Sequence, residues 1–244
     1  MLTGIEISSW GHDLKNGQGL IDLVEAVCAA APECRVRLGS LEPRTVTEDF
    51  CRRAAALPNL CPHFHLSMQS GCDSVLARMN RKYDSERYYE SVRLLNEAYE
   101  TPGITTDLIV GFPGETEEEF QQTLAFIRRC AFSAMHIFPY SRRPGTPADG
   151  MPGQILNSVK EDRAHRAQQA ALEMEAAYLD RWVGRTVPVL FEEERDGLWR
   201  GHTTRYSEVA APSGENLHNQ LRQVYITGRA GNTLQGELCE GQEK

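Results

Sequence analysis

The sequence predicts an α/β protein: a partial parallel βα barrel over residues 1–153, a connecting helix over 154–183 and a small antiparallel β-barrel over 184–240. Strand-like and helix-like segments alternate through the first two-thirds, at roughly the 30- to 40-residue spacing of βαβ units. A run rich in Ala, Glu, Gln and Arg, which all favour helix, follows. From Gly184 onward, short β-like runs are separated by glycine-containing and charged turns, a pattern typical of a small β-barrel.

The strands of the first region are short, apolar or β-branched, and each runs into a turn that contains Gly or Pro. Within them, Leu108, Ile109 and Val110 form a continuous apolar run, which predicts burial on both faces, as in a parallel sheet. Right-handed crossovers would then place the helices outside the sheet. The expected strands are 2–8, 35–41, 63–68, 105–112 and 135–140 in this region, and 186–192, 198–204, 207–211 and 223–227 in the small barrel.

Apolar spacing and capping residues predict the helices. Leu20, Leu23 and Val27 repeat on one face of a helix over 20–31. A second helix, over 85–99, is expected to begin at a Ser85 cap. Thr116 followed by Glu119 matches a capping box, which predicts a third helix from this point.

The net charge of −8 argues against a protein that holds nucleic acid by bulk charge alone, although local basic patches remain compatible with it. Mean hydropathy is −0.45, no apolar run is long enough to cross a bilayer, and the first residues do not resemble a secretory signal. We therefore expect a cytoplasmic location and no membrane partner.

The seven cysteines are scattered and predict reduced thiols, because no two lie at the spacing of a CxxC or CxxxCxxC ligand loop. His63 and His65 alternate on one strand and share a face, a spacing that could bind a metal. With no third ligand nearby, packing histidines are favoured and no metal site is expected. The cysteines are Cys28, Cys34, Cys51, Cys61, Cys72, Cys130 and Cys239.

Polar or glycine-rich segments follow four successive strands of the first region. In parallel α/β barrels the loops at the carboxyl ends of the strands converge on the axis and form the ligand site. Each segment alone could be an ordinary turn, but four in succession favour a shared pocket. The segments are 39–43, 67–71, 111–115 and 138–141. No Walker A loop, HExxH or GxSxG motif accompanies them, so no catalytic residue is expected from such motifs.

Six motifs, in this order, resemble the methylthiotransferase family of radical-SAM enzymes. The set is specific because of its order, and the resemblance covers about residues 1–240. The motifs are LTGIEISSWG at 2–11, RLGSLEP at 37–43, HLSMQSG at 65–71, RMNRKY at 78–83, TDLIVGFPGE at 106–115 and FPYSRRPGTPA at 138–148. The closing region is similar to the TRAM domain of that family, a small RNA-binding β-barrel.

The resemblance implies methylthiolation of a tRNA adenosine beside the anticodon, with S-adenosylmethionine and 4Fe-4S clusters as cofactors. It implies the anticodon stem-loop as partner and a monomer for full-length family members, and it leaves the oligomeric state of this chain open. The motifs at 6–11 and 141–147 are most similar to the branch that acts on N6-threonylcarbamoyladenosine, and the isopentenyladenosine branch is the alternative. The branch that modifies a ribosomal protein fits less well.

The sequence departs from the family pattern in one respect. Family members carry an N-terminal domain and a CxxxCxxC loop after the first barrel strand, and neither occurs here, so the resemblance implies an N-terminally truncated member. We therefore expect that this polypeptide alone holds no cluster, has doubtful catalytic competence and has marginal stability through an open barrel edge. Two other hypotheses of function remain: a non-catalytic RNA-binding remnant, and an α/β-barrel enzyme that uses another cofactor.

The resemblance also assigns candidate residues at the strand ends and in the small barrel. The expected cofactor-binding residues are Ser40, Glu42, Gln69, Asp107, Gly111 and Phe138. The expected RNA-binding residues are Arg81, Arg142, Arg143, Arg200, His202, Arg205 and Tyr206. Arginine forks suit phosphates and aromatic rings suit exposed bases, but structural ion pairs are an equally good explanation of the arginines.

Overall fold

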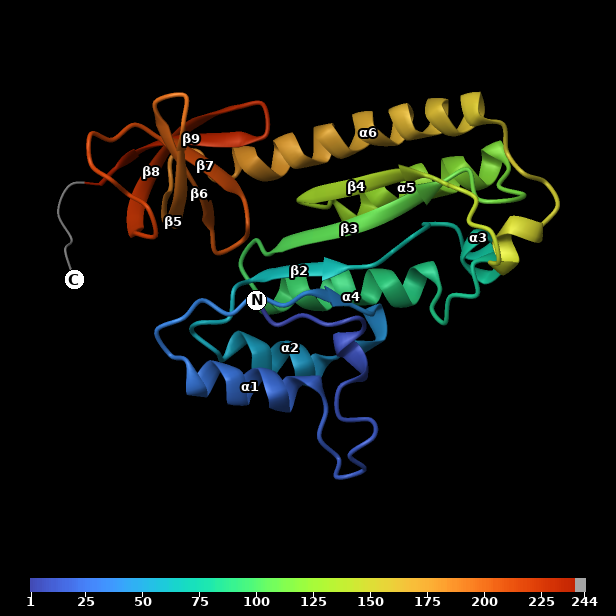
Figure 1. Ribbon diagram of the computed structural model, residues 1–244, viewed down its shortest axis with the longest axis horizontal. Coiled ribbons are helices and arrows are strands. Elements are labelled where there is room, and N and C mark those ends of the chain that lie inside the picture. The colour runs from blue at the N-terminus through green and yellow to red at the C-terminus, as the bar shows by residue number, and fades with distance from the viewer. Residues whose placement is uncertain (240–244) are drawn as a thin grey trace.

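The computed structural model describes residues 1–239, and it contains a parallel sheet with its helices, a long helix and a closed β-barrel (Figure 1). Residue 240, the expected end of the small barrel, lies outside the described residues. Within residues 1–239 no helix is both long and apolar enough to cross a membrane.

The sheet has the order β1-β2-β3-β4 and every pairing is parallel, as predicted. Its strands are β1 (Ser40–Leu41), β2 (His63–Leu66), β3 (Gly103–Val110) and β4 (Ala134–Pro139). The expected strand over 2–8 is wrong: Leu2 makes only an isolated bridge to Leu38, and Ile7–Ser9 is a 3-10 helix, η1. The Ser9 hydroxyl donates to the Glu6 carbonyl there, a local bond that competes with strand pairing. Of the strand expected over 35–41, only Ser40–Leu41 forms a strand, β1.

Helices cover one face of this sheet, with α4 and α5 behind the strands in the view of Figure 1. The Thr116–Glu119 capping box is present as predicted, whereas the cap of α4 is Asp84 rather than Ser85. The side chain of Asp84 accepts the Arg87 N–H at 2.8 Å, and a carboxylate is a strong cap. The helices are α1 (Leu20–Ala30), α2 (Glu48–Ala55), α3 (Asp73–Arg78), α4 (Ser85–Ala98), α5 (Glu117–Cys130) and α6 (Asn157–Asp180), with short 3-10 helices η2 (Pro43–Thr45) and η3 (Pro147–Gly150).

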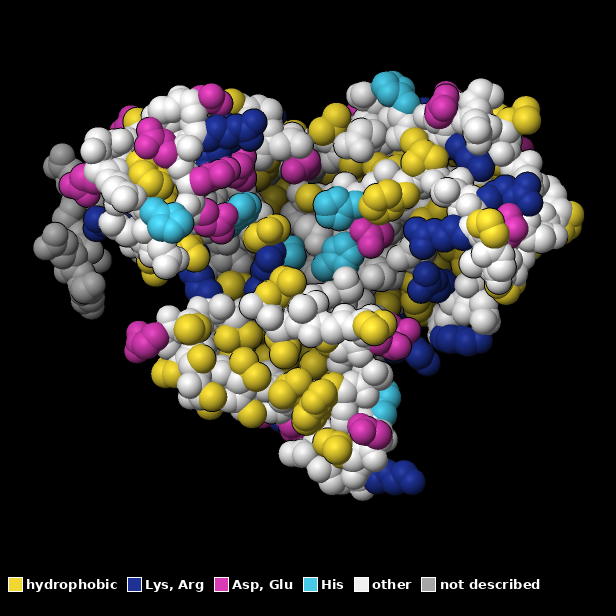
Figure 2. All heavy atoms as spheres, in the orientation of Figure 1, with side chains coloured by type: hydrophobic (Ala, Val, Ile, Leu, Met, Phe, Trp, Pro, Cys, Tyr) yellow, Lys and Arg dark blue, Asp and Glu magenta, His cyan; other side chains and the backbone are white. Residues whose placement is uncertain are grey.

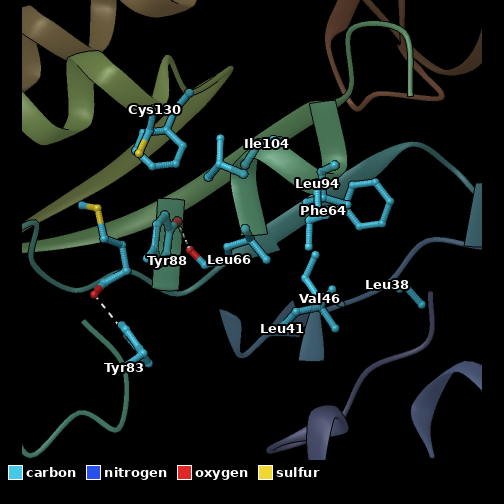
Figure 3. Close-up of a cluster of buried hydrophobic side chains, with 14 of the residues drawn as sticks. Leu38, Leu41, Val46, Phe64, Leu66, Tyr83, Tyr88, Leu94, Ile104 and Cys130 are labelled. Atoms are coloured by element: carbon cyan, nitrogen blue, oxygen red, sulfur yellow. Dashed lines mark hydrogen bonds between the residues drawn. The ribbon is translucent and has the colours of Figure 1, made fainter. Parts of the chain in front are cut away.

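The core lies between the sheet and these helices (Figure 3). Phe64 and Leu66 of β2 are fully buried in it, next to Tyr88 of α4. The Tyr88 hydroxyl donates to the Leu66 carbonyl at 2.9 Å, so the buried phenol is satisfied. Because side chains alternate along a strand, His63 and His65 face away from this core.

A closed five-stranded barrel follows α6, with the order β5-β6-β7-β9-β8. The predicted barrel is therefore present, but it is not wholly antiparallel, because β7 and β9 pair in parallel. The strand β9 was not expected at all; without it the edges of β7 and β8 would be unpaired. The strands are β5 (Thr186–Arg195), β6 (Leu198–Thr203), β7 (Glu208–Ala211), β8 (Leu221–Ala230) and β9 (Thr233–Leu238).

The barrel lies beside the ends of the sheet strands where β2 and β3 begin, opposite to their carboxyl ends (Figure 1). Two arginines hold this junction. Arg35 donates to the carbonyls of His202 and Pro188 at 3.3 and 3.1 Å. Arg205 donates to the carbonyls of Thr101 and Glu100 at 2.8 and 2.9 Å. Both arginines use backbone carbonyls as acceptors, and Arg185 adds an ion pair with the Glu100 carboxylate at 3.0 Å across the same junction.

The helix α6 is fixed to the opposite end of the sheet by a buried ion pair. Arg163 of α6 donates to Glu115 Oε2 at 2.8 Å, and the two side chains are only 5% and 1% exposed. Burial raises the pKa of Glu115, although the Gly111 N–H and Arg163 act in the opposite direction. Gly111 has a φ of +71°, and a Cβ there would lie 2.4 Å from Lys160 Cγ. The loop after β3 therefore has to present bare backbone to α6.

Arg163→Met should lower the free energy of unfolding by about 3 kcal/mol or more, because it leaves a buried carboxylate without its cation. Loss of the cation raises the pKa of Glu115 further, and protonation removes the buried charge. The cost should therefore be larger near pH 8 than near pH 5, as measured by urea unfolding. The Glu115→Gln/Arg163→Met double variant is the control and should recover part of the loss. Equal costs at the two pH values would contradict this account.

Candidate functional site

The face of the sheet that the helices leave uncovered carries a row of polar side chains. The parallel register pairs Ser40 with His65 and Asp107 with His136, so these four residues lie across the strands on that face. Figure 2 shows histidine and acidic side chains gathered in the hollow between the barrel and the sheet. Polar residues on the concave face of a partial barrel can meet a ligand rather than a packed core.

A cavity of about 550 Å³ opens at the carboxyl ends of β2, β3 and β4. Gln69 enters it from the loop after β2, with a φ of 67° that is uncommon for a residue other than glycine. The backbone of β3 holds Gln69 on both sides: its N–H donates to the Asp107 carbonyl, and its carbonyl accepts from Ile109 N, both at 2.9 Å. The cavity is lined by Gln69, Asp107, Ile109, Phe138, Pro139, Tyr140, Ser141, Arg143, Thr146 and Ala148.

Of the six residues expected to bind a cofactor, Gln69, Asp107 and Phe138 line this one cavity. Ser40 lies on the same face but lines a neighbouring cavity of about 520 Å³, which lies between the sheet and the barrel. Glu42 lines a third cavity, of about 490 Å³, next to Arg44. Gly111 is buried against α6 and lines none of the three.

Asp107 is held by a neighbour on the same face. His65 Nε2 lies 3.3 Å from Asp107 Oδ2, and the side chains are 15% and 29% exposed. The hydrogen bond from His65 lowers the pKa of Asp107 below its usual range and outweighs the opposing effect of partial burial. The cavity therefore contains a carboxylate that stays ionised and can accept hydrogen bonds from a ligand.

Several residues that line the strand-end cavity were not predicted from the sequence. Ile109 and Thr146 were not proposed, and Arg143 was expected to contact RNA rather than to line the cavity. The alternation of β3 could have identified Ile109, which shares a face with Asp107. Thr146 belongs to a loop, and no periodicity predicts where a loop folds back.

The expected RNA-binding residues are spread over two ends of the molecule. Near the carboxyl ends of the strands, Arg81 and Arg143 are exposed, and neither forms an ion pair with a described residue. Arg142 is engaged, because its guanidinium donates to the Asp149 carboxylate at 2.8 Å. Arg81 and Arg143 are thus the better placed of the three to meet a phosphate.

The other four lie in the barrel, on the side that meets the sheet. Arg200 pairs with Glu208 at 3.1 Å, and Arg205 is committed to the junction described above. His202 stacks on Tyr206 at 4.5 Å between ring centroids. The guanidinium of Arg37 lies 3.5 Å from the centre of the Tyr206 ring. Tyr206 therefore already has two stacking partners within the protein.

The described residues do not fit a cluster held by three thiolates. Within residues 1–239, no group of three His, Cys, Asp or Glu side chains is placed to hold a metal ion, and all the described cysteines are free. Burial raises the pKa of Cys51 to about 11 and that of Cys130 to about 12, so both stay protonated at neutral pH.

Comparisons with known proteins agree with the motifs. The Radical SAM superfamily model matches residues 7–127. The threonylcarbamoyladenosine tRNA methylthiotransferase MtaB of Bacillus subtilis is 33% identical over 93% of this chain. The tRNA-2-methylthio-N(6)-dimethylallyladenosine synthases of Acidothermus cellulolyticus and Aquifex aeolicus are 41% and 32% identical over 90% and 98% of it. The alignments cover 51%, 43% and 54% of these relatives, so the chain spans about half the length of the curated proteins it matches.

Among solved structures, the fold is similar to that of coproporphyrinogen III oxidase (HemN) from Escherichia coli, a radical SAM enzyme. The TM-score is 0.52, with 17% identity over 64% of this chain and 37% of that one. At this identity the match supports the fold alone. The sequence matches alone lead to the assignment: residues 7–127 are a radical SAM domain, and over most of its length the chain is related to the tRNA methylthiotransferases of that superfamily.

Proposed function

We propose that the cavity at the strand ends binds S-adenosylmethionine, and that the chain is the cofactor- and tRNA-binding part of a tRNA methylthiotransferase. The observation that carries the proposal is the convergence of Gln69, Asp107 and Phe138 on one cavity. These are three of the positions that the motifs assign to the cofactor.

The residues of this cavity are chemically suited to that cofactor. Its volume of about 550 Å³ is within the range of small-molecule sites. Asp107 can accept bonds from hydroxyl or ammonium groups, and Gln69 can both donate and accept. Ile109 and Phe138 supply apolar walls for a purine ring and exclude water from it. When bound, S-adenosylmethionine supplies the radical chemistry of the family.

Two tRNA substrates are supported by specific observations. The motifs at 6–11 and 141–147 favour N6-threonylcarbamoyladenosine beside the anticodon, the substrate named for the Bacillus subtilis relative. The second candidate is the isopentenyladenosine-type substrate, because relatives with that activity in their names are equally similar to this chain. A tRNA substrate would place the protein in the cytoplasm.

A chimera tests this proposal, because the chain spans only part of its relatives. Residues 2–239 would replace the matching segment of the Bacillus subtilis relative, in a strain that lacks both tRNA methylthiotransferase activities. Mass spectrometry of tRNA nucleosides should detect the methylthio derivative of N6-threonylcarbamoyladenosine. The intact relative and a chimera carrying Asp107→Ala are the controls, and the latter should lose most of the product.

The second candidate would replace the first if only the isopentenyladenosine derivative appeared. A chimera that is folded and soluble but forms neither nucleoside, while the intact relative restores one, would contradict the proposed activity.

The barrel is proposed as a TRAM-like RNA-binding module, together with Arg81 and Arg143 at the other end of the sheet. A bound tRNA would then span the molecule, from the barrel to the cavity. The net charge of −8 requires such binding to depend on a few local contacts.

The Arg81→Gln/Arg143→Gln double variant should weaken binding of an anticodon stem-loop RNA and lower the salt slope of its affinity by roughly 1 to 2. Fluorescence anisotropy at several salt concentrations measures both quantities. The matched control is Arg52→Gln/Arg128→Gln, which removes two exposed arginines from α2 and α5. An unchanged slope in the first variant, or an equal loss in the control, would contradict these contacts.

A further inference from the structure

A chain of polar contacts crosses β2 and β3 on the uncovered face and ends at Asp107. His63 Nε2 lies 3.4 Å from Thr105 Oγ1, and the same hydroxyl lies 3.0 Å from His65 Nδ1. His65 Nε2 then lies 3.3 Å from Asp107 Oδ2. The chain begins at the junction with the barrel, where the ring centroid of His63 is 5.3 Å from that of Tyr206. It ends in the cavity of the proposed cofactor site.

The proton positions along this chain follow from its last member. An ionised carboxylate only accepts hydrogen bonds, so His65 must donate from Nε2. In the tautomer with its proton on Nε2, His65 accepts at Nδ1 and the Thr105 hydroxyl donates to it. The hydroxyl in turn accepts from His63 Nε2. This arrangement gives every contact in the chain one donor and one acceptor.

The remaining nitrogen of His63 is consistent with this arrangement. His63 Nδ1 is buried without a hydrogen-bond partner among the described residues. Burial, with contributions from Arg37 and His65, lowers the pKa of His63 to about 3, so the ring is neutral. The unpartnered nitrogen is then a bare acceptor, not a buried N–H or a buried charge. His63 therefore anchors the chain without requiring a counter-ion.

We propose that His65, itself held by the Thr105 hydroxyl, is a positioning residue that holds the Asp107 carboxylate in one orientation. Asp107 Oδ2 is occupied by His65, which leaves its other oxygen for a donor group of the ligand. This inference rests on the proposed function only in naming S-adenosylmethionine as the ligand; the contact between His65 and Asp107 does not depend on that identity. His65 would act through Asp107 and need not touch the ligand itself.

Other titratable or polar groups near Asp107 could also affect its pKa, and they determine which control variants are needed. His136 of β4 is its register partner and has a weaker charge effect on it, with no hydrogen bond between the two side chains. Tyr140 and Arg143 line the cavity from the loop after β4, and Ser40 of β1 carries no charge. His63 and His65 also line the neighbouring cavity between the sheet and the barrel. The charged and titratable groups that share this cavity with them are Arg37, Glu175, Arg205, Tyr206 and Glu208.

Carboxyl-carbon NMR of the full chain, labelled at aspartate, tests the proposal without a ligand. The Asp107 signal is assigned by its loss in Asp107→Asn, and its titration is followed in each variant. His65→Leu should raise the pKa of Asp107 towards the usual aspartate range. Thr105→Val, which keeps the shape but removes the hydroxyl, should move the pKa in the same direction by less.

Two further variants separate the hydrogen bond from general effects of substitution. His65→Gln keeps an N–H donor and should preserve much of the low pKa. His136→Gln removes a histidine from the same face and should leave the pKa of Asp107 close to that of the parent chain. An Asp107 pKa that is the same in the parent and in His65→Leu, or that rises equally in His136→Gln, would overturn the proposal.

Affinity for S-adenosylhomocysteine supplies the functional readout, measured by calorimetry across pH. His65→Leu should bind about three- to tenfold more weakly at neutral pH. Its affinity should also begin to fall at a higher pH on acidification, because the carboxylate protonates earlier. If the parent chain did not bind this probe, the proposed cofactor would be in doubt, whereas the NMR titration would still decide the role of His65.

Discussion

The parallel register of β2, β3 and β4 is the constraint on which the rest of the structure depends. It places Asp107 beside His136 and Ile109 beside Phe138, and it makes the odd-numbered residues of β3 share one face. The even-numbered residues point into the helix-covered core, where Leu108 and Val110 are fully buried. A slip by one residue would exchange the two sets and place the Asp107 carboxylate in an apolar core. Core packing and site geometry are therefore fixed by the same pairing.

Two kinds of contact keep this register aligned with the rest of the chain. At the carboxyl ends of the strands, the buried pair of Glu115 and Arg163 fixes α6 beside the loop after β3. At the opposite ends, Arg35 and Arg205 bind backbone carbonyls across the junction with the barrel. The polar chain from His63 to Asp107 lies between these two ends, and the ring contact of His63 with Tyr206 joins it to the barrel.

Much of the fold could be predicted from the sequence, because local patterns determine it. The apolar run of β3 and the Thr116–Glu119 capping box each gave the correct element. The burial of that run on both faces was wrong, because Ile109 lies on the uncovered face and lines the strand-end cavity. The strand expected over 2–8 was wrong. Whether such a short β-like segment becomes a strand depends on pairing with a neighbouring strand, and local sequence does not reveal that pairing. The strand β9, and its parallel pairing with β7, also depend on contacts that no local pattern reveals. At the site, the strand-end segment 67–71 included Gln69 and the family resemblance assigned Asp107, whereas the contact between His65 and Asp107 depends on the register of β2 and β3.

The most direct test of the central claim is a crystal structure of the chain with S-adenosylhomocysteine. The account predicts that the adenosyl group lies in the cavity at the carboxyl ends of β2, β3 and β4, with a hydroxyl or amino group within hydrogen-bond distance of Asp107 and the purine against Phe138. Density for the ligand in the cavity between the sheet and the barrel, with the strand-end cavity free of it, would contradict the account.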